Sequence, residues 1–479
     1  MLLTITSAWA QKDSLLSDYD YYFQQMELIH PDPYSAFGGK EGFKKAVGEL
    51  RNNLAARDSI SLNDMQVEIT KLLSALHDGH TNVGYPEAPH IEENAWTPLN
   101  LKVIQDGIIV NGYMPEYEFL KGARLQEIES EPLNSVLQRF DKITITENHY
   151  GLMGKACNAL CHNNSIRELF PNFNTHTLSM KFTLTNGNDT IVNLPFYPNG
   201  PKWKTFISPA TDKRFPRNNF EYRFIDNKKT TMVMRIKEIY SADVPDSKDS
   251  TIIVAQAFAQ MLKEMKKKKS RRLIIDLRGN SGGWTPIMYA ALYELYGNHF
   301  LKTNLGFHFT TKISEPLLKR DGITLEQFNN INGTSLKMGE YFEEPSNISN
   351  IKDFMCADKS ILEAQHGKPI YTPKEIYVVT DERTFSAAFH FAYMMHKMGA
   401  TIVGVTSGQA PNTFMELTPF KLPYSGLECS VSNSLQICFT KNHPMTKEFT
   451  PDIQLSYDNY RQFNFSADAE LLFIEKLKK

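Results

Sequence analysis

The chain has 479 residues, of which 41% are apolar and 22% are charged. This composition is ordinary for a globular protein and excludes a fibrous or disordered chain, and the length is enough for two or three domains. The formal net charge of -2 gives no reason to expect nucleic acid or an anionic membrane surface as a partner. We also expect no transmembrane segment, because no apolar run has the length needed to cross a bilayer.

The first ten residues resemble the end of a secretory signal. A short apolar segment is followed by Ala8, Trp9 and Ala10, which fit the small-x-small pattern of a cleavage site. We interpret residues 1–10 as a signal-peptide remnant and predict export to the periplasm or the extracellular space. The five cysteines are too scattered for a disulfide framework, although Cys429 and Cys438 could pair across a hairpin.

Residues 11–90 are predicted to form a helical subdomain, because apolar residues recur every three or four positions. Residues 91–215 change to short strand-like segments separated by glycines. Within this β-rich intermediate region, residues 178–196 indicate a hairpin with its turn at 186–189. Residues 119–140 are weakly similar to the end of a PDZ domain, with a loop glycine before a strand, a turn and a helix.

Residues 216–460 are predicted to form an α/β catalytic core. Short, fully apolar strands alternate with helices there, which indicates a parallel sheet covered on both faces. The polar stretch at about 307–368 has little periodicity, so we interpret it as an insertion or a lid. Residues 461–479 are expected to form a C-terminal helix.

Two strand-to-helix turns in this core carry candidate chemistry. Ser386 opens a helix shortly after an apolar strand, where free N–H groups and the helix dipole favour the oxyanion of acyl transfer. The alternative is that Ser386 only caps the helix. In the other turn, Gly282 and Gly283 permit close backbone approach, so their N–H groups could point at a ligand oxygen. The alternative is that this turn only connects the strand to the helix that follows.

A histidine is the usual general base for a serine nucleophile, because its pKa lies nearest neutrality. Thirteen histidines are present. His80, on the loop HDGHT after the helical region, is a better candidate than His390 and His396, which lie on the helix that Ser386 opens.

The motifs LLSALHDGHT, LIIDLRGNSGG, VVTDERTFSAA, GATIVGVTSG and TPDI occur in this order along the chain. In this respect the chain resembles the S41 family of serine peptidases, the C-terminal-processing and tricorn-core group. The resemblance extends from about Tyr19 to Leu455. It implies a crotonase-like (ClpP-like) α/β core, with Ser386 as the nucleophile and the N–H groups of Ala387 and Gly282 as oxyanion donors.

The processing-protease branch of that family has a lysine base where this chain has Gln409, and an amide is no base near neutral pH. The resemblance therefore favours the histidine-type branch, whose motif matches at His80. That branch adds an acidic residue C-terminal to the nucleophile. The candidates are Glu416, Glu428 and Glu448, and Glu448 is preferred because it precedes the PDI motif.

We therefore predict a serine endopeptidase that acts on protein or peptide substrates without a metal or organic cofactor. Two alternatives stay open. The scaffold could bind a ligand without cutting it, since the resemblance extends to retinoid-carrying proteins, or it could be an esterase or amidase. The sequence does not indicate the cleavage specificity or the oligomeric state.

Overall fold

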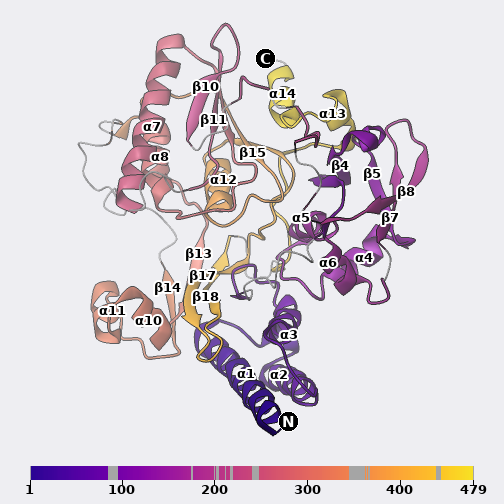
Figure 1. Ribbon diagram of the computed structural model, residues 1–479. Coiled ribbons are helices and arrows are strands. Elements are labelled where there is room, and N and C mark those ends of the chain that lie inside the picture. Colours follow the sequence, from indigo (N-terminus) through magenta and orange to yellow (C-terminus); the bar gives the residue numbers. More distant parts are fainter. Residues whose placement is uncertain are drawn as a thin grey trace.

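The computed structural model describes residues 2–84, 95–173, 176–198, 200, 204–210, 212–215, 220–239, 247–344, 362, 364, 367–438 and 444–477. In the view of Figure 1, an N-terminal group of helices lies at the bottom, a large α/β layer structure lies at the upper left, and a β-rich region lies beside that structure on the right. None of the described helices is long and apolar enough to cross a membrane.

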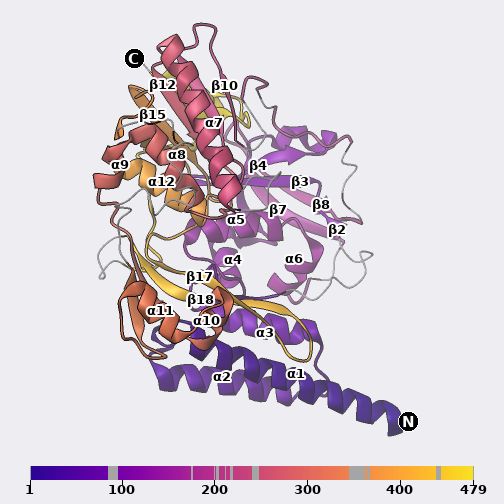
Figure 2. The same ribbon diagram turned by 90° about the vertical axis from the view of Figure 1, so that its left-hand side faces the viewer.

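The N-terminal helices are α1 (Leu2–Ile29), α2 (Lys40–Ala55) and α3 (Leu62–Ser74), with a 3₁₀ turn at Ser35–Phe37. They lie together at one end of the molecule (Figure 2). Ser61 and Asp64 form a capping box at the start of α3, which satisfies backbone N–H groups there. The helices share an aromatic core that includes Tyr19, Tyr22 and Phe43. Residues 2–10 begin α1, and export of the chain stays a prediction.

The β-rich region contains a five-strand path, β3-β4-β5-β7-β8, in antiparallel register. The predicted hairpin is present as β7 and β8. Helices α4, α5 and α6 belong to the same buried cluster as this sheet. The elements are β2 (Ala95–Trp96), β3 (Leu99–Ile104), β4 (Gly107–Tyr113), a 3₁₀ turn (Pro115–Leu120), β5 (Arg124–Ile128), β6 (Glu131–Pro132), α4 (Leu133–Phe140), α5 (His149–Ala159), α6 (Asn163–Leu169), β7 (Thr177–Thr183), β8 (Asp189–Pro195) and β9 (Tyr197–Pro198).

The largest layer is a six-stranded sheet of order β10-β11-β12-β15-β16-β19, parallel except for the edge strand β10. Its strands are β10 (Glu221–Phe224), β11 (Thr231–Arg235), β12 (Arg272–Asp276), β15 (Glu375–Thr380), β16 (Thr401–Gly404) and β19 (Ile453–Gln454). Helices α7 (Ser247–Lys268), α8 (Ile287–Tyr296), α9 (Asn298–Lys302) and α12 (Ala387–Lys397) follow strands of this layer, as do α13 (Tyr457–Gln462) and α14 (Ala469–Lys476) near the C-terminus.

Both faces of this sheet are buried, as the continuous apolar strands predict. Successive side chains of a strand point to opposite faces. Met232 and Met234 pack in the cluster that contains α7, α8 and α12, whereas Val233 packs with α13, α14 and residues of β3 and β4. Strands β12 and β15 are parallel neighbours, with Asp276 opposite Val379, so the turns that follow them meet at one edge.

A second sheet joins the core to the N-terminal helices. It consists of β1 (Asn82–Val83), β13 (His308–Lys312), β14 (Tyr341–Glu344), β17 (Thr413–Lys421) and β18 (Glu428–Ile437). The end of the β17–β18 hairpin packs into the same buried cluster as the three helices, through residues that include Leu422 and Leu427. Cys429 and Cys438 lie at opposite ends of β18 and are both free, so they do not pair.

The stretch at 307–368 contains regular structure in its first part. Strands β13 and β14 enclose α10 (Glu315–Asp321) and α11 (Leu325–Asn332), each begun by a capping residue, Ser314 and Thr324. These helices are too short to show clear apolar periodicity in the sequence, although Leu317 and Leu318 contribute to a small local core. Residues 345–361 lie outside the described part of the chain.

Candidate active site

Ser386 stands at the end of the turn between β15 and α12, in a strained conformation. Its φ of 52° and ψ of -126° are unusual for a residue with a side chain, and such a backbone costs about 1–3 kcal/mol. The side chain makes no capping hydrogen bond to α12, which argues against the cap interpretation. A strained serine at the start of a helix is an arrangement that functional sites maintain and packing alone does not require.

The turn before Ser386 is tied to the turn after β12. The carboxylate of Asp381 accepts the N–H of Gly279 at 2.9 and 3.0 Å, and the N–H of Phe385 donates to the carbonyl of Asn280 at 3.1 Å. Gly282 lies so close that a Cβ there would come within 2.7 Å of the Ser386 Cβ. Its φ of 117° also requires glycine. The two turns therefore form one rigid unit around the serine.

Three N–H groups were predicted as oxyanion donors, and the structure distinguishes among them. The N–H of Gly282 already donates to the side-chain oxygen of Asn280 at 2.9 Å. In the described part of the chain, no acceptor takes the N–H of Gly283 or that of Ala387, the first residue of α12. These two donors, next to Ser386 and its glycine turn, are available for a substrate oxygen.

His80 reaches Ser386 from a different part of the sequence. Its Nε2 lies 3.3 Å from the Ser386 Oγ. The loop that carries it is fixed by β1, which pairs with β18 directly after it, and by the Ser430 hydroxyl, which donates to the His80 carbonyl at 3.1 Å. The imidazole stacks on the ring of Phe385, with centroids 5.0 Å apart. The backbone contacts of the loop and the stacking on Phe385 therefore together fix the position of the imidazole beside Ser386.

Asp78 anchors the backbone of this loop. Its Oδ1 accepts the N–H groups of His80 and Thr81 at 2.9 and 3.2 Å and the hydroxyl of Ser432 at 2.9 Å. Its Oδ2 accepts the Thr81 hydroxyl and Nε2–H of His30. His30 holds that tautomer because its Nδ1 accepts the N–H of Asp32. Burial alone would raise the pKa of Asp78, but these hydrogen bonds, with His30 foremost, lower it to about 2.

We expect Asp78→Asn to lower the free energy of unfolding by about 2–4 kcal/mol at pH 7, because an amide cannot accept all these donors. The folded pKa lies below the ordinary value of about 3.9, so the carboxylate stabilises the fold above pH 4 and loses that effect as the pH falls towards 2. Urea denaturation at pH 7 and pH 3 measures the loss of unfolding free energy and its dependence on pH. The exposed Asp20, paired with Arg51, is the control, and Asp20→Asn should cost under about 1 kcal/mol.

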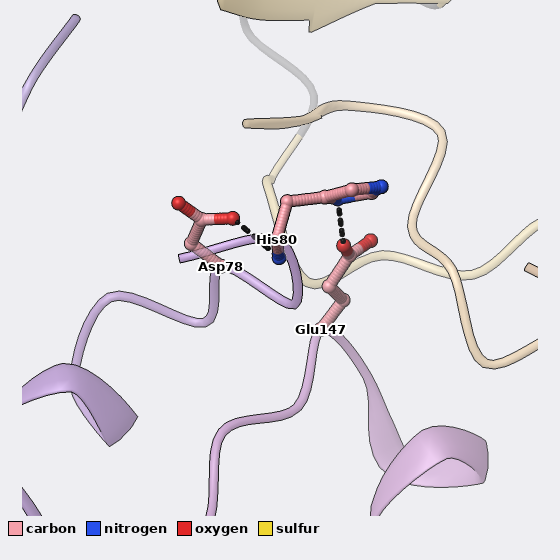
Figure 3. A group of neighbouring side chains, drawn as sticks. All are labelled: Asp78, His80 and Glu147. Carbon is pink, nitrogen blue, oxygen red and sulfur yellow. Dashed lines mark hydrogen bonds and ion pairs between the residues drawn. The ribbon is translucent and has the colours of Figure 1, made fainter. Parts of the chain in front are cut away.

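Glu147 supplies the carboxylate beside the other nitrogen of His80 (Figure 3). Its Oε1 lies 3.4 Å from Nδ1, in an ion-pair contact whose alignment falls outside good hydrogen-bond geometry. Its Oε2 accepts the N–H of Ala410 at 2.9 Å. Gly79 makes the approach possible, because a Cβ there would lie 2.8 Å from Glu147 Oε1 and 2.7 Å from the ring of Phe385.

The two partners affect each other's protonation. Burial disfavours the charged imidazolium, but the carboxylates around it, Glu147 first and then Asp78 and Glu416, together outweigh this effect and raise the pKa of His80. Burial raises the pKa of Glu147, while His80 and the Ala410 N–H oppose that rise. Because both side chains are buried, a charge on one is stabilised mainly by the other.

The structure does not place the acidic candidates from the sequence against His80. Glu448 is half-buried beside Phe449, whose ring packs on Tyr393 and His396 near the far end of α12. Glu428 pairs with Lys421 on the exposed end of the β17–β18 hairpin. Glu416 lies exposed on β17, near enough to help raise the pKa of His80.

Glu147 escaped the sequence reasoning because it comes from a third segment, N-terminal to the nucleophile. It immediately precedes Asn148, whose side chain caps α5 by accepting the N–H of Gly151. That helix start is readable in the sequence, but no spacing relates it to His80 or Ser386.

The carboxylates and imidazole of Asp78, His80 and Glu147 lie within 4.8 Å of one another, a spacing that also suits a metal ion. However, both oxygens of Asp78 and one oxygen of Glu147 already accept hydrogen bonds from protein groups. The donor set therefore fits a hydrogen-bonded support for His80 better than a coordination shell.

A cavity of about 1260 Å³ opens beside this group. It lies between α5 and the turn that leads to Ser386, and it includes Phe385 and Glu147 of the site. Its walls carry both charged and apolar side chains, among them Lys155, Glu382 and Trp96. This volume exceeds the range of about 300–1,000 Å³ that is usual for small-molecule pockets.

Comparisons with known proteins identify the family of the central part of the chain. Residues 234–455 match the model of peptidase family S41. The chain carries an S41 peptidase domain. The S41 domain is that of a serine-type peptidase, a hydrolase. It includes Ser386 and both strand-to-helix turns, whereas His80 and Glu147 precede it. No curated protein matches the chain significantly.

Among solved structures, the chain resembles CPAF in fold. A CPAF mutant has a TM-score of 0.59 at 15% identity, covering 98% of this chain and 99% of that chain. Mature CPAF gives 0.58 at 14% identity over the same shares. Mature CPAF complexed with lactacystin gives 0.57 at 15% identity, covering 96% of this chain and 98% of that one. The shared fold thus extends well beyond the S41 domain and includes the segments that carry His80 and Glu147.

Proposed function

We propose that the chain is a serine endopeptidase that hydrolyses peptide bonds through an acyl-enzyme on Ser386, with His80 as the general base and Glu147 as its acidic partner. The observation that carries the proposal is the 3.3 Å contact between His80 Nε2 and Ser386 Oγ, which joins groups 306 residues apart. This distance suits proton transfer from a hydroxyl to an imidazole.

The first step is attack of the Ser386 Oγ on a substrate carbonyl carbon as His80 takes the hydroxyl proton. Glu147 stabilises the imidazolium that forms and keeps Nε2 directed at the serine. The N–H groups of Ala387 and Gly283 stabilise the oxyanion. His80 then gives its proton to the leaving amine. In the second half-reaction, water attacks the acyl-enzyme as His80 takes a proton from it, and His80 returns that proton to the Ser386 Oγ as the acid leaves.

Protein or peptide substrates suit the cleft beside the site. The cavity continues from Glu147 and Phe385 along α5, past Gly151 and Gly154, so an extended chain has room on that side of the nucleophile. Gly154 of this helix lets α5 pack closely against the turn before Ser386, because a Cβ there would come within 2.8 Å of the Glu382 side chain. We therefore favour a peptide over a compact ester as the natural substrate.

An alkyl fluorophosphonate tests the proposal, because it phosphonylates an activated serine. We expect one adduct, mapped to Ser386 by peptide mass spectrometry, and none in Ser386→Ala. Absence of labelling in the folded wild-type chain would contradict the proposal and favour a binding protein on this scaffold. Labelling together with turnover of small esters but not of a denatured protein would instead indicate an esterase or amidase.

A further inference from the structure

Gln409 lies directly against the nucleophile and is fully buried. Its Oε1 accepts the backbone N–H of Ser386. Its Nε2 is buried as well and has no hydrogen-bond partner among the described residues. The fold therefore keeps a buried polar side chain beside Ser386 although its amide N–H groups have no acceptor in the described part of the chain.

The Ser386 N–H needs such an acceptor. With φ at 52°, the residue departs from the helix that follows, and its N–H would otherwise be left inside the protein without a partner. A lysine at position 409 has donors only and could not take this role. Glutamine is suited to it because its amide oxygen is a hydrogen-bond acceptor.

We propose that Gln409 is a positioning residue for the reaction. It holds Ser386 in the strained conformation that presents Oγ to His80, and it withdraws the Ser386 N–H from the oxyanion site, so that Ala387 and Gly283 alone donate there. This inference rests on the proposed peptidase function and adds to it a residue that touches neither the substrate nor the transferred proton.

The segment around Gln409 contacts both the turn before Ser386 and the side chain of Glu147. The Ser407 hydroxyl donates to the Gln409 carbonyl at 3.1 Å, and the next N–H, that of Ala410, donates to Glu147. Gly408 lies against the turn before Ser386, since a Cβ there would come within 2.4 Å of the Glu382 carbonyl. One short stretch therefore fixes both the backbone of the nucleophile and the acid behind the base.

Two near-isosteric variants separate the acceptor role from simple packing. Gln409→Met keeps the shape but removes the acceptor, and we expect kcat on a fluorogenic peptide to fall about 10- to 100-fold with KM within about twofold. Gln409→Glu keeps an acceptor and should recover kcat to within about fivefold of the wild type. Gln66→Met, which removes a buried glutamine of α3 far from the site, is the control and should leave kcat unchanged.

A crystal structure of Gln409→Met provides a readout that does not depend on activity. We expect Ser386 to leave the positive-φ region and its Oγ to move away from His80. Wild-type kcat in Gln409→Met, equal losses in the Met and Glu variants, or an unchanged Ser386 φ would each overturn the inference. Failure of the peptidase proposal is distinguished because it removes fluorophosphonate labelling from the wild type, whereas failure of the Gln409 inference leaves that labelling intact.

Discussion

Replacing Ser386 or His80 with alanine is expected to lower kcat toward a denatured protein substrate by about 10⁴-fold or more. Ser386→Ala removes the atom that forms the acyl-enzyme, and His80→Ala removes the only imidazole within 3.3 Å of it among the described residues. The double variant should be no worse than either single one, because the two residues act as a unit. Release of labelled peptides from casein measures the loss.

His396→Ala is the matched control for the histidine. His396 lies on the same helix as Ser386 but at its end, where it pairs with Asp452 at 3.3 Å. That variant should retain the wild-type rate, and all variants should keep the wild-type circular dichroism spectrum. Undiminished proteolysis by a folded Ser386→Ala protein would refute the assignment of the nucleophile.

Glu147→Gln is expected to lower kcat by about 10²- to 10⁴-fold and to change the pH profile. Because the Glu147 carboxylate contributes most among the groups that raise the pKa of His80 against the effect of burial, its loss should lower that pKa. His80 must be neutral to act as a base, so activity rises with pH through its pKa. The wild-type acid limb in kcat/KM should therefore lie above about 6.5, and the limb of Glu147→Gln should lie at lower pH.

Glu448→Gln is the natural comparison, because the sequence favoured Glu448 as the acidic partner. With Glu448 beside Phe449 near the far end of α12, this variant should keep both the rate and the acid limb of the wild type. A loss in Glu448→Gln with normal activity in Glu147→Gln would return the role to Glu448 and reject the arrangement around His80 described above.

Much of the core could be predicted because its signals are local. The continuous apolar strands indicate a sheet buried on both faces. A serine that follows such a strand and opens a helix must lie at the edge of the sheet where the strand ends. The glycine turn at Gly282 belongs to the neighbouring strand, so its proximity to Ser386 follows from the parallel order of β12 and β15. His80 could be paired with Ser386 only through the resemblance of motifs, since no local pattern joins positions so distant.

The remaining features depend on contacts that have no sequence period. Glu147 meets His80 only because α5 and its leading loop pack against Gly408 and Ala410 of the core. The difference between the N–H groups of Gly282 and Gly283 depends on the side chain of Asn280, which accepts the N–H of Gly282. The sequence shows that Gln409 stands where the family has a lysine, but it does not show that the Gln409 side chain accepts the Ser386 N–H.

The origin of the three catalytic groups in separate packing units has a consequence for the life of the chain. His80 follows the N-terminal helices, Glu147 precedes a helix of the β-rich region, and Ser386 belongs to the central layer. Under the proposed mechanism, Ser386 is an ordinary serine alcohol in any chain in which one of these units has not docked. On that mechanism, cleavage activity therefore requires that all three units are docked.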